Sequence, residues 1–243
     1  MDTPSKIALV TGATRGIGLE TVRQLASGGL HTLLAGRDAA RTEQAARALQ
    51  AKGLPVEPIV LEVTDEASIA AAARQVERAY GRLDILINNA GVLRDDDSLP
   101  PSAQTLQVWR ETFDTNLFGL IAVTQAFLPL LRKSDAGRIV NVSSILGSIA
   151  LHVDPASPIY SYKIPAYDVS KTAVNAWTVH LAHELRDSAI KVNAIHPGSV
   201  KTDMNAGGSL DLEQGASTSV ALALLGQEGP TGGFVHLGQT LPW

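Results

Sequence analysis

The stretch IALVTGATRGIG, residues 7–18, decides how this chain folds. Its first four residues predict a buried strand, and the glycine-rich turn that follows leads into a helical pattern with Leu19, Val22 and Leu25. Glycines let a backbone approach a pyrophosphate closely, and the amides at the start of a helix attract its charge. We therefore expect a nucleotide site here. A glycine turn without a nucleotide is the alternative, which the flanking strand and helix disfavour.

Strand and helix patterns alternate from this stretch to the end of the chain. Apolar strand patterns recur at residues 31–35, 56–61, 83–87, 137–142 and 190–195, with a last one within 229–237. Helical patterns separate them, among them residues 39–52, residues 106–133 and a helix that follows Tyr167. The alternation predicts an α/β fold in which residues 1–243 form one domain, a doubly wound, Rossmann-type parallel sheet of seven strands.

The composition argues against several classes of partner. With 45% hydrophobic residues, a chain of 243 residues can bury one large core. A net charge of −4 and the lack of a lysine- or arginine-rich run argue against nucleic acid and membrane surfaces. The sequence has no cysteine, no export signal pattern at residues 1–6, and no apolar run approaching about 18 residues. We expect a cytoplasmic protein that acts on a small molecule.

The residues after the second strand pattern bear on which nucleotide is bound. Gly36-Arg37 stands where an NAD-selective site places an acid on the ribose hydroxyl, and no acid is present. Arg37, and Arg15 in the glycine turn, can instead pair with a 2′-phosphate through the planar guanidinium group. The sequence thus predicts NADP(H) as the cofactor, with solvated arginines as the alternative.

The stretch Tyr167-Asp168-Val169-Ser170-Lys171 supplies a candidate reacting pair. Tyr167 and Lys171, four residues apart on a helix, lie on the same face. An ammonium group roughly 6 Å from a phenol, at an effective dielectric of about 20, lowers the phenol pKa by about two units. The pKa of Tyr167 would then approach neutrality, where the group both gives and takes a proton. Such a pair alone is a weak motif, so it needs support from other residues.

Polar residues stand where strands and helices would meet a ligand. Asn88-Asn89-Ala90-Gly91 follows the strand pattern 83–87, and Ser143-Ser144 follows the pattern 137–142. The carboxyl ends of parallel strands face the crevice in which ligands bind, so a serine of this pair can contact a substrate. Asn116 lies in an apolar helical stripe and needs hydrogen-bond partners if it is buried.

In this order along the chain, the motifs resemble those of the short-chain dehydrogenase/reductase family. The matching features are the Gly-x-x-x-Gly-x-Gly turn, Asn-Asn-Ala-Gly, Asn116 in Asn-x-x-Gly, Ser144, the Tyr167 and Lys171 pair, and Pro197-Gly198. The resemblance covers essentially the whole chain. The length between Ser144 and Tyr167 and the ending of the chain look more like the carbonyl-reductase branch than the ketoacyl-carrier reductases.

The resemblance implies a reaction and a set of site residues. NADPH would pass a hydride to a ketone or aldehyde, or the reverse reaction would oxidise an alcohol, with Tyr167 as the proton donor. Ser144 would fix the carbonyl oxygen, Lys171 would hold the cofactor ribose and lower the pKa of the phenol, and Asn116 would hold a water that touches the lysine. A ketoacyl-carrier-type reductase and a non-catalytic NADP-sensing protein on the same fold remain alternatives.

The cofactor-binding residues that the resemblance implies follow several strand patterns or lie on the helix that carries Tyr167. They are Gly12, Thr14, Arg15, Gly16, Ile17, Gly18, Arg37, Glu62, Val63, Asn89, Ala90, Gly91, Tyr167, Lys171, Pro197, Gly198, Val200 and Thr202. Glu62 and Val63 would hold the adenine, although the family commonly has an aspartate at the first of these positions.

Two segments have no assigned chemistry. Between Ser144 and Tyr167 lie 22 residues, about ten more than the resemblance leads us to expect. We interpret residues 152–163 as an inserted loop, and either it lines the substrate pocket as part of 148–165 or it packs on the surface. The acidic run Asp95-Asp96-Asp97 is interpreted as a solvated loop.

Metal binding and assembly complete the expectations. His180 and His183 are three residues apart on a helix, but no third ligand is apparent, so we predict no metal site. Members of the family commonly pair through two long helices, here about 106–133 and 167–187. We expect a homodimer or homotetramer rather than a monomer.

Overall fold

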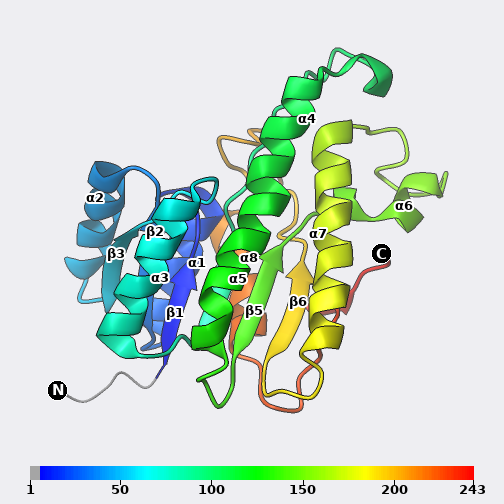
Figure 1. The fold of residues 1–243 in the computed structure, drawn as a ribbon. Coiled ribbons are helices and arrows are strands. Elements are labelled where there is room, and N and C mark those ends of the chain that lie inside the picture. Colours follow the sequence, from blue (N-terminus) through cyan, green and yellow to red (C-terminus); the bar gives the residue numbers. More distant parts are fainter. Residues whose placement is uncertain (1–5) are drawn as a thin grey trace.

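The computed structural model describes residues 6–243, and its centre is an eight-stranded sheet in the order β3-β2-β1-β4-β5-β6-β7-β8 (Figure 1). Residues 1–5, part of the segment interpreted as carrying no export signal, lie outside the described residues. The strands are β1 (Ile7–Val10), β2 (His31–Gly36), β3 (Val56–Val60), β4 (Ile85–Asn88), β5 (Arg138–Val142), β6 (Lys191–Ile195), β7 (Phe234–His236) and β8 (Gln239–Thr240).

Strands β1 to β7 pair in parallel, as the sequence predicts. The sequence did not indicate β8, which adds an antiparallel edge strand to β7. Leu237 and Gly238 join the two strands with φ angles of 45° and 79°. Positive φ at both turn residues is typical of the tight hairpins whose twist matches that of the strands.

The order of the strands reverses between β1 and β4. Strand β1 pairs with β2 on one side and with β4 on the other, and all four residues of β1 are buried. Such a reversal opens a crevice outside the carboxyl ends of the strands, where ligands bind in open α/β sheets. Strand β5 ends at the same edge of the sheet, since it is parallel to β4 and its Asn141 lies opposite Asn88.

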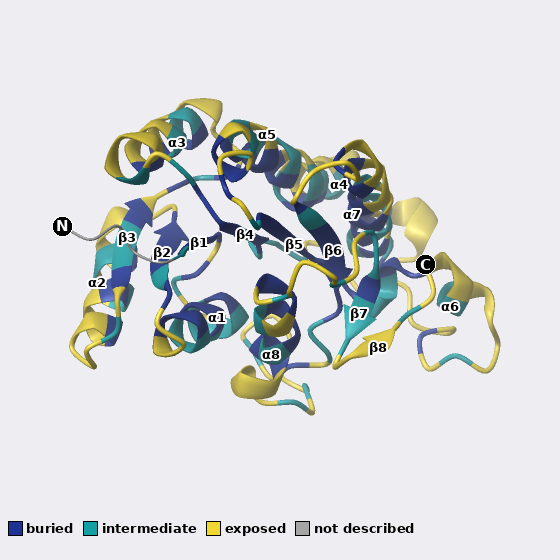
Figure 2. Ribbon diagram, turned by 90° about the horizontal axis from the view of Figure 1, so that it is seen from below, coloured by how far each residue is buried: buried dark blue, intermediate teal, exposed yellow. Residues whose placement is uncertain are grey.

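Helices cover both faces of the sheet, as expected for a doubly wound fold (Figure 2). On one face lie α1 (Gly16–Ser27), α2 (Ala39–Gln50) and α8 (Leu212–Ala223). On the other lie α3 (Glu66–Tyr80), α5 (Leu120–Leu131) and α7 (Pro165–Glu184). Each layer encloses its own apolar cluster, so the sheet is buried on both sides.

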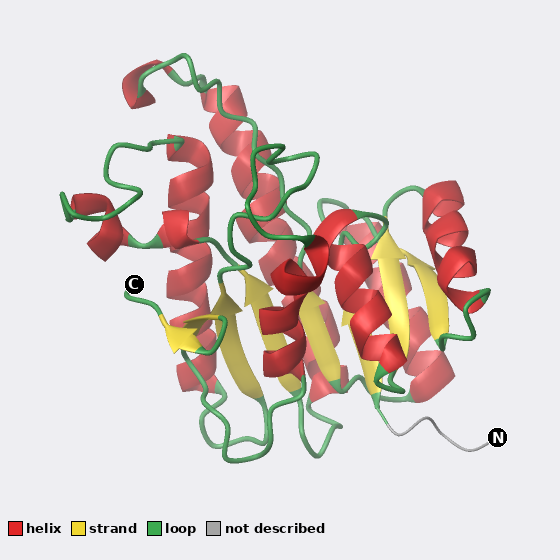
Figure 3. Cartoon of the chain, turned by 180° about the vertical axis from the view of Figure 1, so that it is seen from behind, coloured by secondary structure: helices red, strands yellow, loops and turns green. Residues whose placement is uncertain are grey.

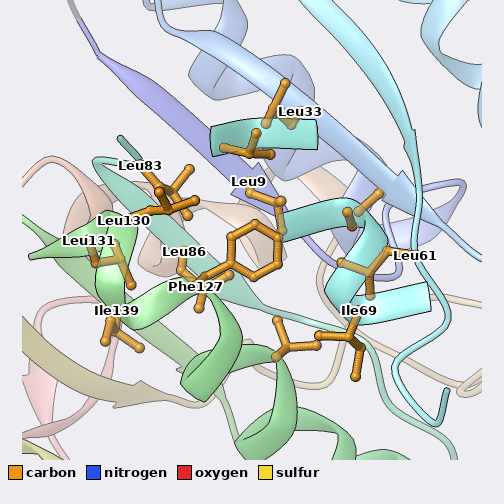
Figure 4. Packing of buried hydrophobic residues seen from close by; sticks show 14 of the residues in the cluster. Leu9, Leu33, Leu61, Ile69, Leu83, Leu86, Phe127, Leu130, Leu131 and Ile139 are labelled. Atoms are coloured by element: carbon orange, nitrogen blue, oxygen red, sulfur yellow. The ribbon is translucent and has the colours of Figure 1, made fainter. Parts of the chain in front are cut away.

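Phe127 of α5 is at the centre of one of these clusters (Figure 4). It is fully buried among Leu9, Leu33 and Leu86 from three neighbouring strands. Burying a phenylalanine side chain contributes about 2–3 kcal/mol. The cluster fixes the helices that carry Asn116 and Lys171 against the sheet.

The predicted helix 106–133 consists of α4 (Leu106–Phe113), a π turn (Asp114–Gly119) and α5. Contrary to our reading of the sequence, the stretch Leu106–Leu131 is long and apolar enough to cross a membrane. In the most apolar 18-residue part of this stretch, 44% is buried inside the protein. A core helix of a soluble protein meets the same criterion, and the buried side of α5 packs on the sheet.

The residues interpreted as an inserted loop, 152–163, have turns and irregular backbone from residue 154 on, as predicted. Only the first two of them belong to a helix, α6 (Ile149–Val153), which a 3₁₀ turn (Ile145–Gly147) precedes. Ser148 caps α6 by accepting a hydrogen bond from the Leu151 amide. A further 3₁₀ turn (Pro101–Ala103) precedes α4. Helix α7 starts at Pro165, because proline is favoured in the first turn of a helix.

Candidate active site

The candidate site lies at the carboxyl ends of the strands, where the loops gather in Figure 3. In the glycine turn, Gly12 and Gly16 have φ angles of 63° and 58°, which side-chain-bearing residues rarely adopt. A Cβ at Gly12 would lie 2.8 Å from Ala90 Cα, and one at Gly18 would lie 2.5 Å from Asn89 Nδ2. The turn therefore needs glycine at both places, because the Asn-Asn-Ala-Gly segment packs directly against it.

The two asparagines of that segment brace the strands. Asn88 Nδ2 donates to Thr124 Oγ1 at 3.0 Å and to Asn141 Oδ1 at 2.9 Å. Asn89 Nδ2 donates to the Thr11 carbonyl at 2.8 Å. These bonds join the end of β4 to β5, to α5 and to the turn after β1.

Asn116 is fully buried within the π turn. Its Oδ1 accepts from the Val92 amide at 2.8 Å, and its Nδ2 donates to the Val92 carbonyl at 2.9 Å and to Ser170 Oγ at 3.0 Å. The π turn distorts the helix at Asn116, and π turns of this kind are frequent at functional sites. A Cβ at Gly91 would lie 3.4 Å from Asn116 Oδ1 and 3.6 Å from Lys171 Nζ, so Gly91 leaves space beside both groups.

Tyr167 and Lys171 lie together on α7, as predicted. Lys171 Nζ is 5.6 Å from the centre of the Tyr167 ring and donates to the Val142 carbonyl at 2.8 Å. Ser144 hydrogen-bonds to the Tyr167 side chain. The Ser143 hydroxyl instead donates to Asn175 Oδ1 at 2.6 Å and to the Lys171 carbonyl at 3.2 Å. Of the two serines, Ser144 is therefore the one that contacts Tyr167.

The pKa of Tyr167 differs from our expectation. Burial raises the pKa of Tyr167 to about 12, against a lowering by the hydrogen bond from Ser144. Burial also lowers the pKa of Lys171 to about 8. The predicted shift of the phenol toward neutrality is thus wrong for the protein alone, because removal of the phenolate from water outweighs the nearby groups that favour it.

Charged side chains flank the glycine turn on two sides. Arg37 Nη1 lies 3.8 Å from Glu62 Oε2, so the carboxylate of Glu62, which follows β3, is close to the end of β2. Arg15 forms an ion pair with Asp203 in the loop after β6. A Cβ at Gly16 would meet only Thr202 Cγ2, at 4.0 Å, which leaves an open cradle between the turn and this loop.

The loop after β6 folds back on itself. Gly198 has a φ of 93°, and a Cβ there would lie 2.3 Å from Leu210 Cδ1. Val200 is buried and forms a β-bridge with Leu210, while Thr202 bridges to Asn205. The segment Pro197-Gly198 and residues 199–210 therefore form a compact wall beside the glycine turn. Val63, at the far side of the crevice, packs its carbonyl against Gly119 of the π turn.

Comparison with known proteins gives the family. The family model described as short chain dehydrogenase matches residues 6–212. The chain belongs to this family. It is 41% identical to the short-chain dehydrogenase anuI of Penicillium roqueforti over 90% of this chain and 89% of that protein. It is 36% identical to the (+)-neomenthol dehydrogenase of Arabidopsis thaliana over 96% of each. The NADPH-bound carbonyl reductase from chicken fatty liver superposes with a TM-score of 0.84, at 32% identity over 98% of each chain.

In this short-chain dehydrogenase the sequence reading missed Asp95. The acidic run was interpreted as solvated, yet Asp95 Oδ1 accepts from the Ala166 amide at 2.7 Å and Oδ2 from the Tyr167 amide at 3.0 Å. Only the fold brings Asp95 to these amides. The available signal was the start of α7, where neither Ile164 nor Pro165 can act as a side-chain cap.

A second polar group beside Tyr167 is Asp168. Its Oδ2 accepts from the Ile164 amide at 3.0 Å and lies 3.5 Å from His152 Nε2 of α6. Burial raises the pKa of Asp168 to about 7. Lys163 contacts His152 Nδ1 at 2.9 Å within the inserted segment, and the contact between His152 and Asp168 attaches this segment to the helix that carries Tyr167.

His180 and His183 are exposed on α7. Over residues 6–243, no group of three or more histidine, cysteine, aspartate or glutamate side chains is arranged to hold a metal ion.

Proposed function

We propose that this short-chain dehydrogenase catalyses the NADPH-dependent reduction of a ketone or aldehyde, and the reverse oxidation of the alcohol. The family supports oxidoreductase chemistry at a coarse level. The observation that carries the finer proposal is that Ser144 and Lys171 both lie beside the Tyr167 side chain. Asn116 donates a hydrogen bond to Ser170 on the same helix.

NADP(H) is the cofactor that the residues fit best. The glycine turn leaves an open cradle beside Thr202, and the first turn of α1 presents free amides toward it. Arg15 and Arg37 have side chains that are 74% exposed and can pair with a 2′-phosphate. A relative of 32% identity, the chicken carbonyl reductase, was solved with NADPH bound. When bound, the nicotinamide supplies the hydride.

Tyr167 acts as the proton donor in this proposal. A phenol whose pKa is about 12 holds its proton at neutral pH, which suits transfer from its Oη to the carbonyl oxygen as that oxygen gains charge. Ser144 donates a hydrogen bond to the same oxygen and fixes its position. Burial thus keeps the phenol in the protonated form that the reduction needs.

Lys171 and Asn116 support this transfer. Lys171 holds the cofactor ribose and stabilises the phenolate that remains after Tyr167 has lost its proton. Asn116 holds a water that returns a proton from solvent toward the lysine. A buried amide that only satisfies the π turn is the alternative for Asn116, and its bonds to Val92 fit that role as well.

The inserted segment 148–165 lines the substrate pocket in this proposal. The Tyr162 side chain is close enough to Tyr167 to raise its pKa further, so the segment reaches the reacting group. Tyr162 is half exposed, at 53%, and can present its ring to a substrate.

The test is a screen of ketones and aldehydes for carbonyl-dependent oxidation of NADPH, with the alcohol product identified and NADH as a parallel cofactor. We expect NADPH oxidation that equals the alcohol formed. If NADPH binds but no carbonyl in a broad panel is reduced, a non-catalytic NADP-sensing role replaces the proposal.

A further inference from the structure

The start of α7 leaves two backbone amides that its own sequence cannot satisfy. Helices leave their first N–H groups without an intrahelical acceptor, and a polar side chain before the helix usually accepts them. Here the residue before the helix is Ile164, and Pro165 has no N–H. Ala166 and Tyr167 therefore carry the free amides of the first turn, and the second of these belongs to the candidate proton donor.

A carboxylate from a distant loop accepts both amides. Asp95 Oδ1 is 2.7 Å from the Ala166 nitrogen, and Asp95 Oδ2 is 3.0 Å from the Tyr167 nitrogen. The nearer carboxylate, Asp168, is already bonded to the Ile164 amide. In the described part of the chain, these two amides donate to no acceptor other than Asp95.

The loop that carries Asp95 is itself fixed to the site. Val92, three residues earlier, exchanges two hydrogen bonds with the Asn116 side chain, at 2.8 and 2.9 Å. Asn116 in turn donates to Ser170 on α7. The short segment from Val92 to Asp95 thus connects Asn116 to the backbone of Tyr167. Helix α7 is held at its start by Asp95 and at Ser170 by Asn116.

We propose that Asp95 is a positioning residue for Tyr167: it sets the start of α7, and with it the phenol, relative to Ser144 and Asn116. A carboxylate is suited to this place because it accepts two bonds and carries negative charge at the positive end of the helix. The inference rests on the proposed function, since it gives the positioned phenol a reaction to perform.

The experiment compares Asp95→Ala and Asp95→Asn with Asp97→Ala. Asp97 belongs to the same acidic run and is exposed, so it matches the change in charge without touching α7. We expect Asp95→Ala to lower kcat, calculated from the concentration of NADPH-binding sites, by about tenfold. Small displacements of a reacting group are costly for the rate. The Kd for NADPH, measured by fluorescence titration, should stay within about twofold. In Asp95→Asn the single amide oxygen can accept a hydrogen bond from only one of the two backbone amides, so this variant should have an intermediate kcat.

Hydrogen exchange gives a readout that does not depend on turnover. In Asp95→Ala the amides of residues 164–171 should exchange faster than in the wild type, while Asp97→Ala should match the wild type. The proposal is overturned if kcat per binding site is the same in the Asp95 and Asp97 variants, or if exchange at 164–171 is unchanged. If Asp95→Ala does not fold, Asp95→Asn decides. If the wild type reduces no carbonyl, the proposed function fails, and exchange still decides whether Asp95 holds the start of α7.

Discussion

At Tyr167, burial and the neighbouring hydroxyl act on the phenol in opposite directions. Burial dominates and raises the pKa of Tyr167 to about 12, while the Ser144 hydrogen bond lowers it. The lysine beside it is buried as well, and its own pKa falls to about 8. In the proposed reaction, Tyr167 would therefore give a proton, and the charge of Lys171 would matter most once that proton has left.

Tyr167→Phe tests this role directly. The change keeps the ring and removes the proton, so we expect turnover to fall by about 10² or more while the protein folds and binds NADPH. Carbonyl-dependent NADPH oxidation measures the first effect, and thermal unfolding with a fluorescence titration of NADPH measures the second. Turnover close to that of the wild type would remove Tyr167 from the mechanism.

Arg37 is the second residue whose role can be separated from its surroundings. Its guanidinium lies 3.8 Å from the Glu62 carboxylate, so a phosphate would have to compete with that acid. Arg37→Asp adds a repelling charge and should raise the KM for NADPH by about tenfold or more, and the KM for NADH by much less. Arg41→Asp, on the exposed side of α2, is the matched control. Equal effects on both cofactors would show that Arg37 does not select the phosphate.

At the scale of elements, α7 gathers most of the site on one helix. It carries Tyr167, Ser170 and Lys171, and its first turn depends on carboxylates for its free amides. Asp168 is buried in this turn, and one of its oxygens has no hydrogen-bond partner among the described residues. That arrangement disfavours the ionised form of Asp168 and makes the start of the helix sensitive to pH.

Asp168→Asn should reveal this sensitivity in stability. The pKa of Asp168 is about 7 in the folded protein against 3.8 for the unperturbed group. Between these values the folded state keeps a proton that the unfolded state has lost, so this group's contribution to stability falls as pH rises. Asparagine does not ionise, so the variant does not lose this stability as pH rises. The unfolding free energy of the variant minus that of the wild type should therefore rise by about 2 kcal/mol from roughly pH 5 to 7.

Urea unfolding at several pH values measures this difference. Asp187→Asn changes the same charge at an exposed position, with a side chain 85% exposed, and serves as the control. A difference between Asp168→Asn and the wild type that does not change with pH would contradict the inferred ionisation of Asp168.

At the scale of the whole molecule, two helical surfaces are available for assembly. The stretch of α4, the π turn and α5 lies beside α7 in Figure 1, and these elements pack against each other. Phe118, Val169 and Val179 on this surface are large apolar residues with exposures of 56%, 46% and 43%. The inserted segment attaches at the start of α7 and leaves these three side chains exposed.

We expect a homodimer or homotetramer that buries this surface around a two-fold axis. Light scattering at micromolar concentration should give two or four times the 25.6 kDa of one chain. Val179→Glu should lower that mass, and Leu224→Glu, an exposed leucine just after α8 on the opposite layer, should not. A wild-type mass near that of one chain would show that this surface does not pair.

The sequence by itself determined the main strands and helices and the order of the site motifs. The glycine turn, the Asn-Asn-Ala-Gly segment and the Tyr167 to Lys171 spacing depend on backbone geometry within a few residues, so they can be interpreted from adjacent letters. The parallel order of β1 to β7 follows from the alternation of strands and helices.

Only the tertiary structure decided the partners of these motifs. Asp95 meets the Tyr167 amide across 72 residues, and Arg15 meets Asp203 across 188. The direction of the Tyr167 pKa shift, opposite to the sequence-based expectation, also depends on how far the fold removes the phenol from water. Periodicity and spacing specify which face a residue occupies along one element, whereas burial and hydrogen-bond partners depend on which other elements the fold brings to that face.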